Sequence, residues 1–366
     1  TKRSSNLELF RILTMILIIA HHYVVNSGLQ DVMYIDPLSS KSIFLFLFGA
    51  WGKTGINCFI LITGYFMCKS NITMKKFIKL LAEVMFYRFM IYAIFLITGV
   101  QGFTAKEFVQ QFIPFNTLSG NFTGTFLTFF LCIPFLNILI KNMTEKQHVY
   151  LIVLSCFIYV FFGTVPYFSV SMNYVSWFIV LYFISSYIRL YPKKIFTSAK
   201  IWGISSVFFI VVSSISVVAC LWLSVKLDKT YAYYFVTDSN TFLALATGIS
   251  TFMFFKNINL RYNKLINMLG GSTFGVLLIH ANSDKMREWL WQDTLNNVGA
   301  YDLSWTAIHA IGSVLCIFII CSVIDILRIK LIETPLLKKC ENNFNKIIVW
   351  YKKKENQVFD KLKINS

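Results

Sequence analysis

The sequence predicts an all-α protein, a polytopic transmembrane helix bundle of about ten spans with both termini in the cytoplasm. Its 366 residues are 56% hydrophobic and only 14% charged, with a mean hydropathy of +0.63; soluble domains are about half apolar and a quarter charged. Apolar runs of about 20 residues, the length that crosses a bilayer as a helix, recur along the chain. Lysine and arginine gather in every second loop, which is the pattern that orients membrane helices.

The first expected span, 6–28, is an apolar stretch behind a short basic start. Nine further spans share its composition, and we expect them at about 43–67, 80–100, 124–140, 149–163, 175–190, 201–225, 241–255, 265–282 and 304–327. Glycines at 49, 52 and 55 interrupt the second span, and such breaks let backbone line a cavity inside a membrane. Residues 283–303 carry charges of both signs and predict an amphipathic surface helix.

The net charge of +17 comes from the loops between spans and from the tail. The basic loops lie at 69–79, 141–146, 189–200 and 256–264. Since orientation in a membrane accounts for them, we do not expect nucleic acid as a partner. We divide the chain into a transmembrane domain, 1–335, and a basic cytoplasmic tail, 336–366. The tail suits either an amphipathic helix on an anionic inner leaflet or a solvated segment.

The first span carries Arg11 and His22, eleven positions apart. Eleven residues are close to three helical turns, so both side chains share a face and are separated along the axis by about 16 Å. His21 points about 100° away from them. Ionisable residues inside a bilayer are expensive and tend to mark sites or pathways, so we expect a functional pair; the alternative is a satisfied polar pair that joins helices.

Other ionisable residues fall at two membrane levels. His280 and His309 are predicted near the outer level of His22, where an imidazole can exchange protons near neutral pH. Alternatively, His280 is a helix-end residue that meets interfacial water, and for His309 a structural role is the favoured interpretation. Lys53, in the glycine-broken span, suits an anionic ligand group or extends to the interface. Five residues apart in the third span, Glu83 and Arg88 suggest a structural pair with each other or with Arg11. His148 is predicted to be solvated in a cytoplasmic loop.

Two lysines open the third span on the cytoplasmic side. Lys76 and Lys79 are one turn apart and share a face. Together with Arg11 they suit the phosphates of a cytoplasmic ligand, which bind by charge-assisted hydrogen bonds; orientation of the span explains them equally well. The eight cysteines form no CxxC pair, so free packing thiols are expected. We expect no metal site, because no paired histidine spacing occurs.

The order of these motifs resembles the integral-membrane acyltransferase-3 family, and within it the O-acetyltransferases of capsular and other surface polysaccharides. That family carries an arginine, ten residues and then a histidine in its first span, as Arg11 and His22 do here. Its second span ends in an aromatic-rich run around a glycine, here FILITGYF with Gly64. Its third span opens with two basic residues separated by two, here Lys76 and Lys79 in place of the usual arginines.

Three later stretches extend the resemblance over essentially the whole chain. The fourth span contains Pro-Phe-Leu-Asn at 134–137, and the ninth ends in TFGVLLIH at His280, with Leu277 where the family usually has tyrosine. An acidic residue and a proline, Glu333 and Pro335, follow the last span.

The resemblance implies a membrane O-acyltransferase that moves acetyl from cytoplasmic acetyl-CoA to a hydroxyl of a cell-surface or lipid-linked polysaccharide, in a bacterial plasma membrane. We expect the donor's phosphates near Lys76, Lys79 and Arg189, with its acyl arm passing Arg11. His22 would act as general base or be transiently acylated. Lys53 would stabilise the oxyanion and His280 would orient the acceptor.

Two alternatives remain open at this point. A transporter or flippase of lipid-linked glycan would use Arg11 and His22 for coupling, but we find no internal repeat of the kind transporters show. A glycan polymerase would need a large extracytoplasmic loop, and the outer loops here are short. The sequence does not specify the acceptor sugar or the acyl group.

Overall fold

The computed structural model describes residues 4–115, 122–339 and, in the tail, 349–350, 353–354 and 357. Every regular element in this part of the chain is helical. The longer helices are α1 Ser5–Val25, α3 Ser40–Gly49, α4 Gly52–Met67, α5 Met74–Ile97, α7 Phe122–Asn142, α8 Glu145–Cys156, α10 Tyr174–Leu190, α11 Ala199–Leu227, α12 Phe242–Asn257, α13 Lys264–His280 and α16 Thr306–Arg328. The shorter ones are α2 Leu29–Met33, α6 Ala105–Gln111, α9 Phe162–Thr164, α14 Asp284–Glu288 and α15 Asn297–Tyr301, with π-helical turns at Phe157–Phe161, Trp289–Thr294 and Ile329–Glu333 and a 3-10 helix at Lys194–Thr197.

The predicted all-α fold is confirmed, and each of the ten expected spans coincides with a helix. Among the residues that the structure describes, seven helical segments are long and apolar enough to cross a membrane, and an eighth qualifies if the bent pair Lys264–His280 and Asp284–Thr294 is one span. The helix Tyr174–Leu190 is apolar but shorter. The number of spans and the side on which the termini lie therefore remain predictions.

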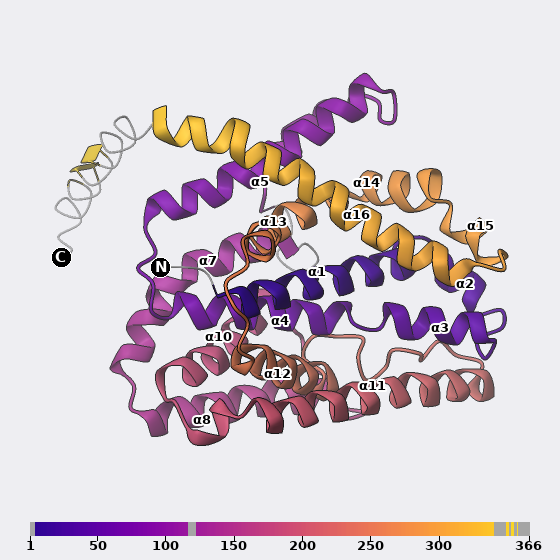
Figure 1. Cartoon of the computed structure of the whole chain (residues 1–366), viewed down its shortest axis with the longest axis horizontal. Helices are drawn as coiled ribbons and strands as arrows, with labels where there is room; N and C mark the ends of the chain where they lie inside the picture. Colours follow the sequence, from indigo (N-terminus) through magenta and orange to yellow (C-terminus); the bar gives the residue numbers. More distant parts are fainter. Residues whose placement is uncertain (1–3, 116–121, 340–348, 351–352, 355–356, 358–366) are drawn as a thin grey trace.

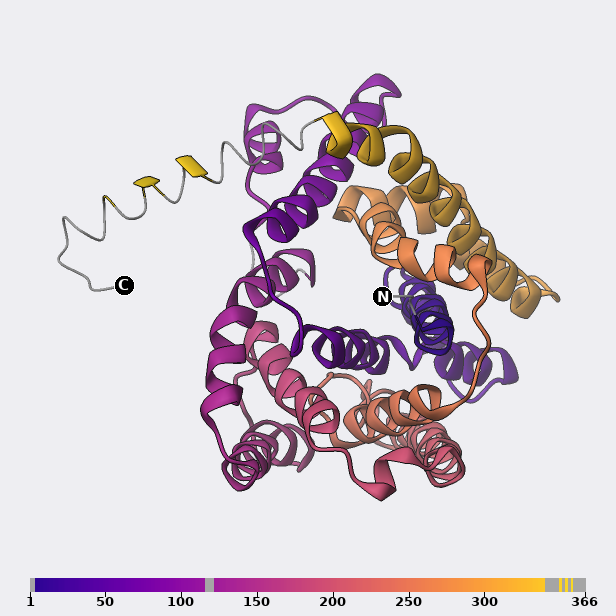
Figure 2. The same ribbon diagram turned by 60° about the vertical axis from the view of Figure 1, so that its left-hand side comes forward.

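The helix α1 runs through the middle of the bundle (Figures 1 and 2). It packs against α3, α4, α12, α13 and α16. In both views α5 and α16 lie on one side of α1 and α4, and α8, α11 and α12 lie on the other. The first turn of α1 and the last turn of α16 lie at the same end of the bundle (Figure 1), which is the arrangement that two termini on one side of a membrane require.

The glycine break in the second span lets α1 approach closely. The chain ends α3 at Gly49 and begins α4 at Gly52. A Cβ at Gly52 would overlap the ring of His21, and one at Gly55 would lie 2.8 Å from Ile18. Only glycine allows this approach, so the break positions α4 tightly beside the histidine end of α1.

The prediction for His148 is wrong. Its side chain is fully buried in α8, where Nε2 lies 3.0 Å from the carbonyl oxygen of Phe183 on α10. Rings of Tyr187 and Tyr191 pack around it. This histidine joins two helices, since its helix begins at Glu145 and not several residues later.

Two further expectations need correction. Glu83 pairs with Arg328 of α16 at 3.0 Å, and Arg88 instead donates to the carbonyl oxygens of Gln110 and Gln111. The segment 283–303 is not one surface helix but three short helical pieces, and Trp291 within it is fully buried. The predicted tail lies mostly outside the described residues.

Candidate active site

A cavity of about 140 Å³ lies beside the second half of α1, enclosed by α4 and by the ends of α7, α10 and α13. Its lining combines apolar side chains with five polar ones. Those five are His22, Lys53, Thr123, Tyr174 and Arg287. Apolar lining with a few placed polar groups is the usual character of a small-molecule site.

Two histidines fix each other's protonation in this site. Nδ1 of His280 lies 2.7 Å from the carbonyl oxygen of Val276, one turn earlier in α13. Because a carbonyl oxygen only accepts, this nitrogen carries the proton, and Nε2 of neutral His280 is an acceptor. Nδ1 of His22 lies 3.0 Å from that Nε2 and donates to it. His22 is thereby held as the tautomer with an unprotonated Nε2, the form that can accept a proton or attack a carbonyl.

The sequence prediction that histidines gather at one level is confirmed. Ring centroids of His21 and His22 are 6.0 Å apart, and those of His22 and His280 are 5.2 Å apart. His309 joins the group through the hydroxyl of Tyr23, 2.8 Å from its Nδ1. His21 turns away and donates to the carbonyl oxygen of Gly49 at 2.7 Å. Of these four, only His22 lines the cavity.

Lys53 projects into the same cavity from the first turn of α4. Its Nζ donates to the hydroxyl of Tyr174 at 2.8 Å. One turn further along both helices, Trp177 donates to Asn57 at 2.9 Å, and this buried bond fixes α10 against α4. The ammonium group is therefore held by Tyr174 at the cavity that His22 also lines. Tyr174 was missed by the sequence reasoning, although it follows an uncharged loop where a span begins.

Arg287 was also missed. It lies on α14, inside the segment predicted to be a surface helix, and its guanidinium pairs with Asp284 at 2.5 Å. Its Nε is buried and has no hydrogen-bond partner within the part of the chain that the structure describes. No local pattern reports this position, because Arg287 reaches the cavity only through the 96° bend between α13 and the helical segment Asp284–Thr294.

Arg11 lies on the stripe of α1 that lines the cavity. Met15, Ile18 and His22 all contribute to the lining, and Arg11 is one turn before Met15 on the same face. Its guanidinium lies 3.5 Å from the carboxylate of Glu8. The predicted shared face of Arg11 and His22 is therefore the face turned toward the cavity.

The other predicted cations each have a protein partner. Nζ of Lys76 donates to Ser70 and to the carbonyl oxygen of Asn71 at 2.8 and 2.7 Å. Arg189 donates to the hydroxyl of Tyr65 at 2.8 Å and stacks on its ring. Both therefore contact the end of α4 and the loop that follows it.

Lys79 turns the other way. Its Nζ pairs with Glu333 at 2.7 Å, on the turn after α16. Although Lys76 and Lys79 are one turn apart, their partners lie in different parts of the bundle. A role for the two lysines in one phosphate site remains a prediction.

A cavity with basic lining residues lies beside Lys76. This cavity of about 570 Å³ is lined by Lys69 and Lys141, by Asn137, and by the residues Ser70 and Asn71 that Lys76 contacts. Leu190, next to Arg189, completes one wall. Lysines from two basic loops thus meet at one surface, a meeting that the linear sequence does not reveal.

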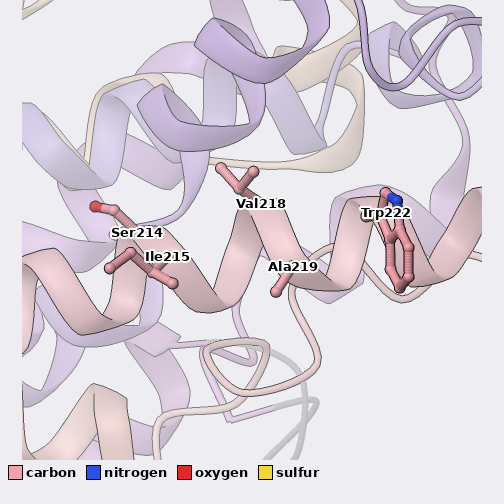
Figure 3. Close-up of a pocket in the computed structure, with 5 residues that line it drawn as sticks. All are labelled: Ser214, Ile215, Val218, Ala219 and Trp222. Carbon is pink, nitrogen blue, oxygen red and sulfur yellow. The ribbon is translucent and has the colours of Figure 1, made fainter.

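The outer face of α11 holds another depression of about 570 Å³, shown in Figure 3. Its walls are Ile215, Val218, Ala219 and Trp222, together with Ser214. The serine hydroxyl already donates to the carbonyl oxygen of Ile210 at 2.9 Å. With apolar walls and no ionisable side chain, this surface suits lipid chains rather than chemistry.

A bundle of apolar helices of membrane-spanning length, with a cavity lined by His22 and Lys53 and with buried His280 bonded to His22, indicates an integral-membrane protein with a polar site inside its helix bundle. A family model described as an acyltransferase domain matches residues 4–325. The chain belongs to the integral-membrane acyltransferase-3 family, and it is a multi-pass membrane acyltransferase. No curated protein and no solved structure matches it significantly.

Proposed function

We propose that this protein transfers an acetyl group from acetyl-CoA to a hydroxyl of a cell-surface or lipid-linked polysaccharide, in a bacterial plasma membrane. The observation that carries the proposal is the His280–His22 pair, which presents an unprotonated Nε2 to a cavity inside the membrane domain. Family membership supplies the acyl-transfer class. The finer assignment of donor and acceptor rests on the resemblance of the motifs.

In the proposed reaction His22 acts as the general base. Nε2 takes the proton of the acceptor hydroxyl while its oxygen attacks the thioester carbonyl. The tetrahedral intermediate collapses as the carbon–sulfur bond breaks, and the proton passes from His22 to the departing thiolate, which gives CoA and the acetyl ester. In a variant route Nε2 attacks the thioester first and the carbon–sulfur bond breaks, so that CoA leaves as the thiolate. The sugar oxygen then takes the acetyl group from Nε2, and the proton of its hydroxyl passes to the thiolate.

Lys53 would stabilise the oxyanion, because its side chain lines the cavity together with His22 and its ammonium donates to the hydroxyl of Tyr174. Removing one oxyanion donor costs about 10²–10³ in kcat. We expect Lys53→Met to lower kcat by that factor and Tyr174→Phe to lower it less, because the charge remains but loses its orientation. Initial rates with labelled acetyl-CoA measure both. Equal activity of Lys53→Met and wild type would exclude this role.

On the donor side, the basic cavity at Lys69 and Lys141 supports phosphate binding, with Lys76 and Arg189 beside it. Arg11 lies between this end of the bundle and the reacting cavity on the α1 stripe. We expect Arg11→Ala to bind labelled CoA more weakly than wild type does. Arg11→Lys keeps the positive charge and should retain part of the affinity for CoA. Unaltered CoA binding in Arg11→Ala would remove Arg11 from the donor path.

The function is tested with the purified full-length protein in nanodiscs, labelled acetyl-CoA and a panel of oligosaccharides. An acetyltransferase releases CoA and forms labelled ester in the presence of an acceptor. A flippase would move lipid-linked glycan between leaflets without consuming the donor, and a polymerase would lengthen the glycan. No labelled ester with any acceptor would reject the proposal.

A further inference from the structure

A further cavity, of about 450 Å³, lies where α5, α6 and the start of α14 meet. Pockets for small molecules usually fall between about 300 and 1,000 Å³. Most of its lining side chains carry hydrogen-bonding groups, among them Tyr92, Gln101, Gln110 and Asn282. This cavity has no role in the proposed function described above.

Its walls are held in place by hydrogen bonds among α5, α6 and the segment between them. Arg88 on α5 donates to the carbonyl oxygens of Gln110 and Gln111 at 2.6 and 3.1 Å, which ties the end of α6 to α5. Glu107 accepts hydrogen bonds from Gln101 at 3.0 Å and Thr104 at 2.8 Å. These bonds hold the pKa of Glu107 below its ordinary value, so it stays an acceptor.

The charged residues at the start of α14 are also paired. Arg287 pairs with Asp284 at 2.5 Å, and Lys285 pairs with Glu288 at 2.9 Å. These two cations have carboxylate partners, and most of the other polar side chains of the lining are amides and hydroxyls. Such a lining matches the hydroxyls of an uncharged sugar better than a phosphate or a carboxylate.

One buried group in the wall has no partner. The side chain of Tyr92 is 6% exposed, and its hydroxyl oxygen makes no hydrogen bond to any residue that the structure describes. Buried polar groups are nearly always hydrogen-bonded, and leaving one unpaired is costly. Gln110 also lines this cavity, and its backbone carbonyl oxygen accepts a hydrogen bond from Arg88.

The two cavities share a wall. Arg287 lines both the Tyr92 cavity and the His22 cavity, and consecutive residues Ala281 and Asn282 line one each. The chain bends by 96° between α13 and the helical segment Asp284–Thr294. Arg287 therefore separates a molecule held at Tyr92 from the cavity that His22 lines.

We infer that the cavity at Tyr92, Gln110 and Arg287 is the acceptor subsite, which takes one uncharged sugar residue of the glycan and directs a hydroxyl past Arg287 to Nε2 of His22. The inference rests on the proposed function for its direction. The binding of the sugar is a separate property and is measured without donor.

The test uses full-length protein in nanodiscs and tritium-labelled oligosaccharides, one set of neutral hexose and N-acetylhexosamine chains and a matched sialylated set. Equilibrium binding without acetyl-CoA is compared for wild type, Tyr92→Phe and Gln110→Ala. Each variant removes one hydrogen-bonding group, so we expect about a 10-fold loss of affinity for the neutral chains. Val109→Ala, at an exposed position of the same helix, is the matched control and should bind as wild type does.

Folding is separated from binding by thermal unfolding. Tyr92→Phe deletes only an unpartnered hydroxyl, so its unfolding temperature should equal or exceed that of wild type. Weaker sugar binding at equal stability supports the inference, even if no acetyl ester forms. Wild-type affinity in both variants, tighter binding of the sialylated set, or no binding of any chain would overturn it. Failure of ester formation with intact, Tyr92-dependent sugar binding would reject the proposed acetyl transfer alone.

Discussion

Replacing His22 with alanine is expected to lower the rate of acetyl transfer by about 10²–10⁴-fold, the contribution of a positioned general base. The expectation follows from the order of donors and acceptors along Val276, His280 and His22, which leaves only Nε2 of His22 to take a proton inside the cavity. The measurement is the formation of labelled ester by purified protein, at saturating donor and matched protein amounts.

The neighbour on the same helix provides a matched control. His21 donates to the carbonyl oxygen of Gly49 and does not line the cavity. His21→Gln keeps a donor for that carbonyl, so near-wild-type activity is expected. An activity of His22→Ala equal to that of His21→Gln would contradict the assignment of the base.

The role of His280 is tested by two substitutions of different chemistry. His280→Asn keeps an oxygen that can accept from Nδ1 of His22, whereas His280→Leu removes the acceptor. We expect the leucine variant to lose more kcat than the asparagine variant, with the KM for both substrates little changed. In the structure His280 lies behind His22 and does not line the cavity, so a positioning role suits it better than the acceptor contact predicted from the sequence.

The fold class could be predicted because the bilayer imposes a strong constraint on sequence. Apolar runs of spanning length and alternating basic loops follow from the need to satisfy every backbone group in lipid and to orient each helix. The same reasoning placed Arg11 and His22 on one face of α1, since helical periodicity determines which residues share a face. These features are local along the chain.

The rest of the site depends on contacts between distant segments. Tyr174 and Arg287 reach the His22 cavity from α10 and α14, and neither position has a local pattern that reports its partner. His148 was assigned to solvent because the predicted span began four residues too late, although it is fully buried. Glu83 pairs with Arg328, which is 245 residues away in the sequence. Span lengths and charge patterns carry no information about such pairings.

Arg328 provides the prediction with the largest expected effect on stability. Its guanidinium donates to three carboxylates, those of Asp325 at 2.8 Å, Glu333 at 2.8 Å and Glu83 at 3.0 Å. The arginine side chain is 6% exposed and that of Asp325 is fully buried. Tyr87 donates to the same oxygen of Asp325 at 2.7 Å. The cluster therefore ties α5 to α16 at the end of the bundle where α1 begins.

Removing Arg328 leaves the carboxylates of Glu83 and Asp325 without their cation, while Glu333 keeps Lys79. Breaking one side of a buried ion pair costs about 3–5 kcal/mol, so Arg328→Met should unfold at a clearly lower temperature than wild type in the same detergent. The added substitutions Glu83→Gln and Asp325→Asn remove the stranded charges and should recover much of the loss.

Lys193→Met also deletes a cation from an ion pair, but that pair is largely exposed, with side-chain exposures of 48% and 40%. Since exposed pairs contribute little, its unfolding temperature should stay at the wild-type value. Equal unfolding temperatures for Arg328→Met and Lys193→Met would show that the carboxylates around Arg328 are compensated by other groups, and that the cluster does not hold α5 to α16.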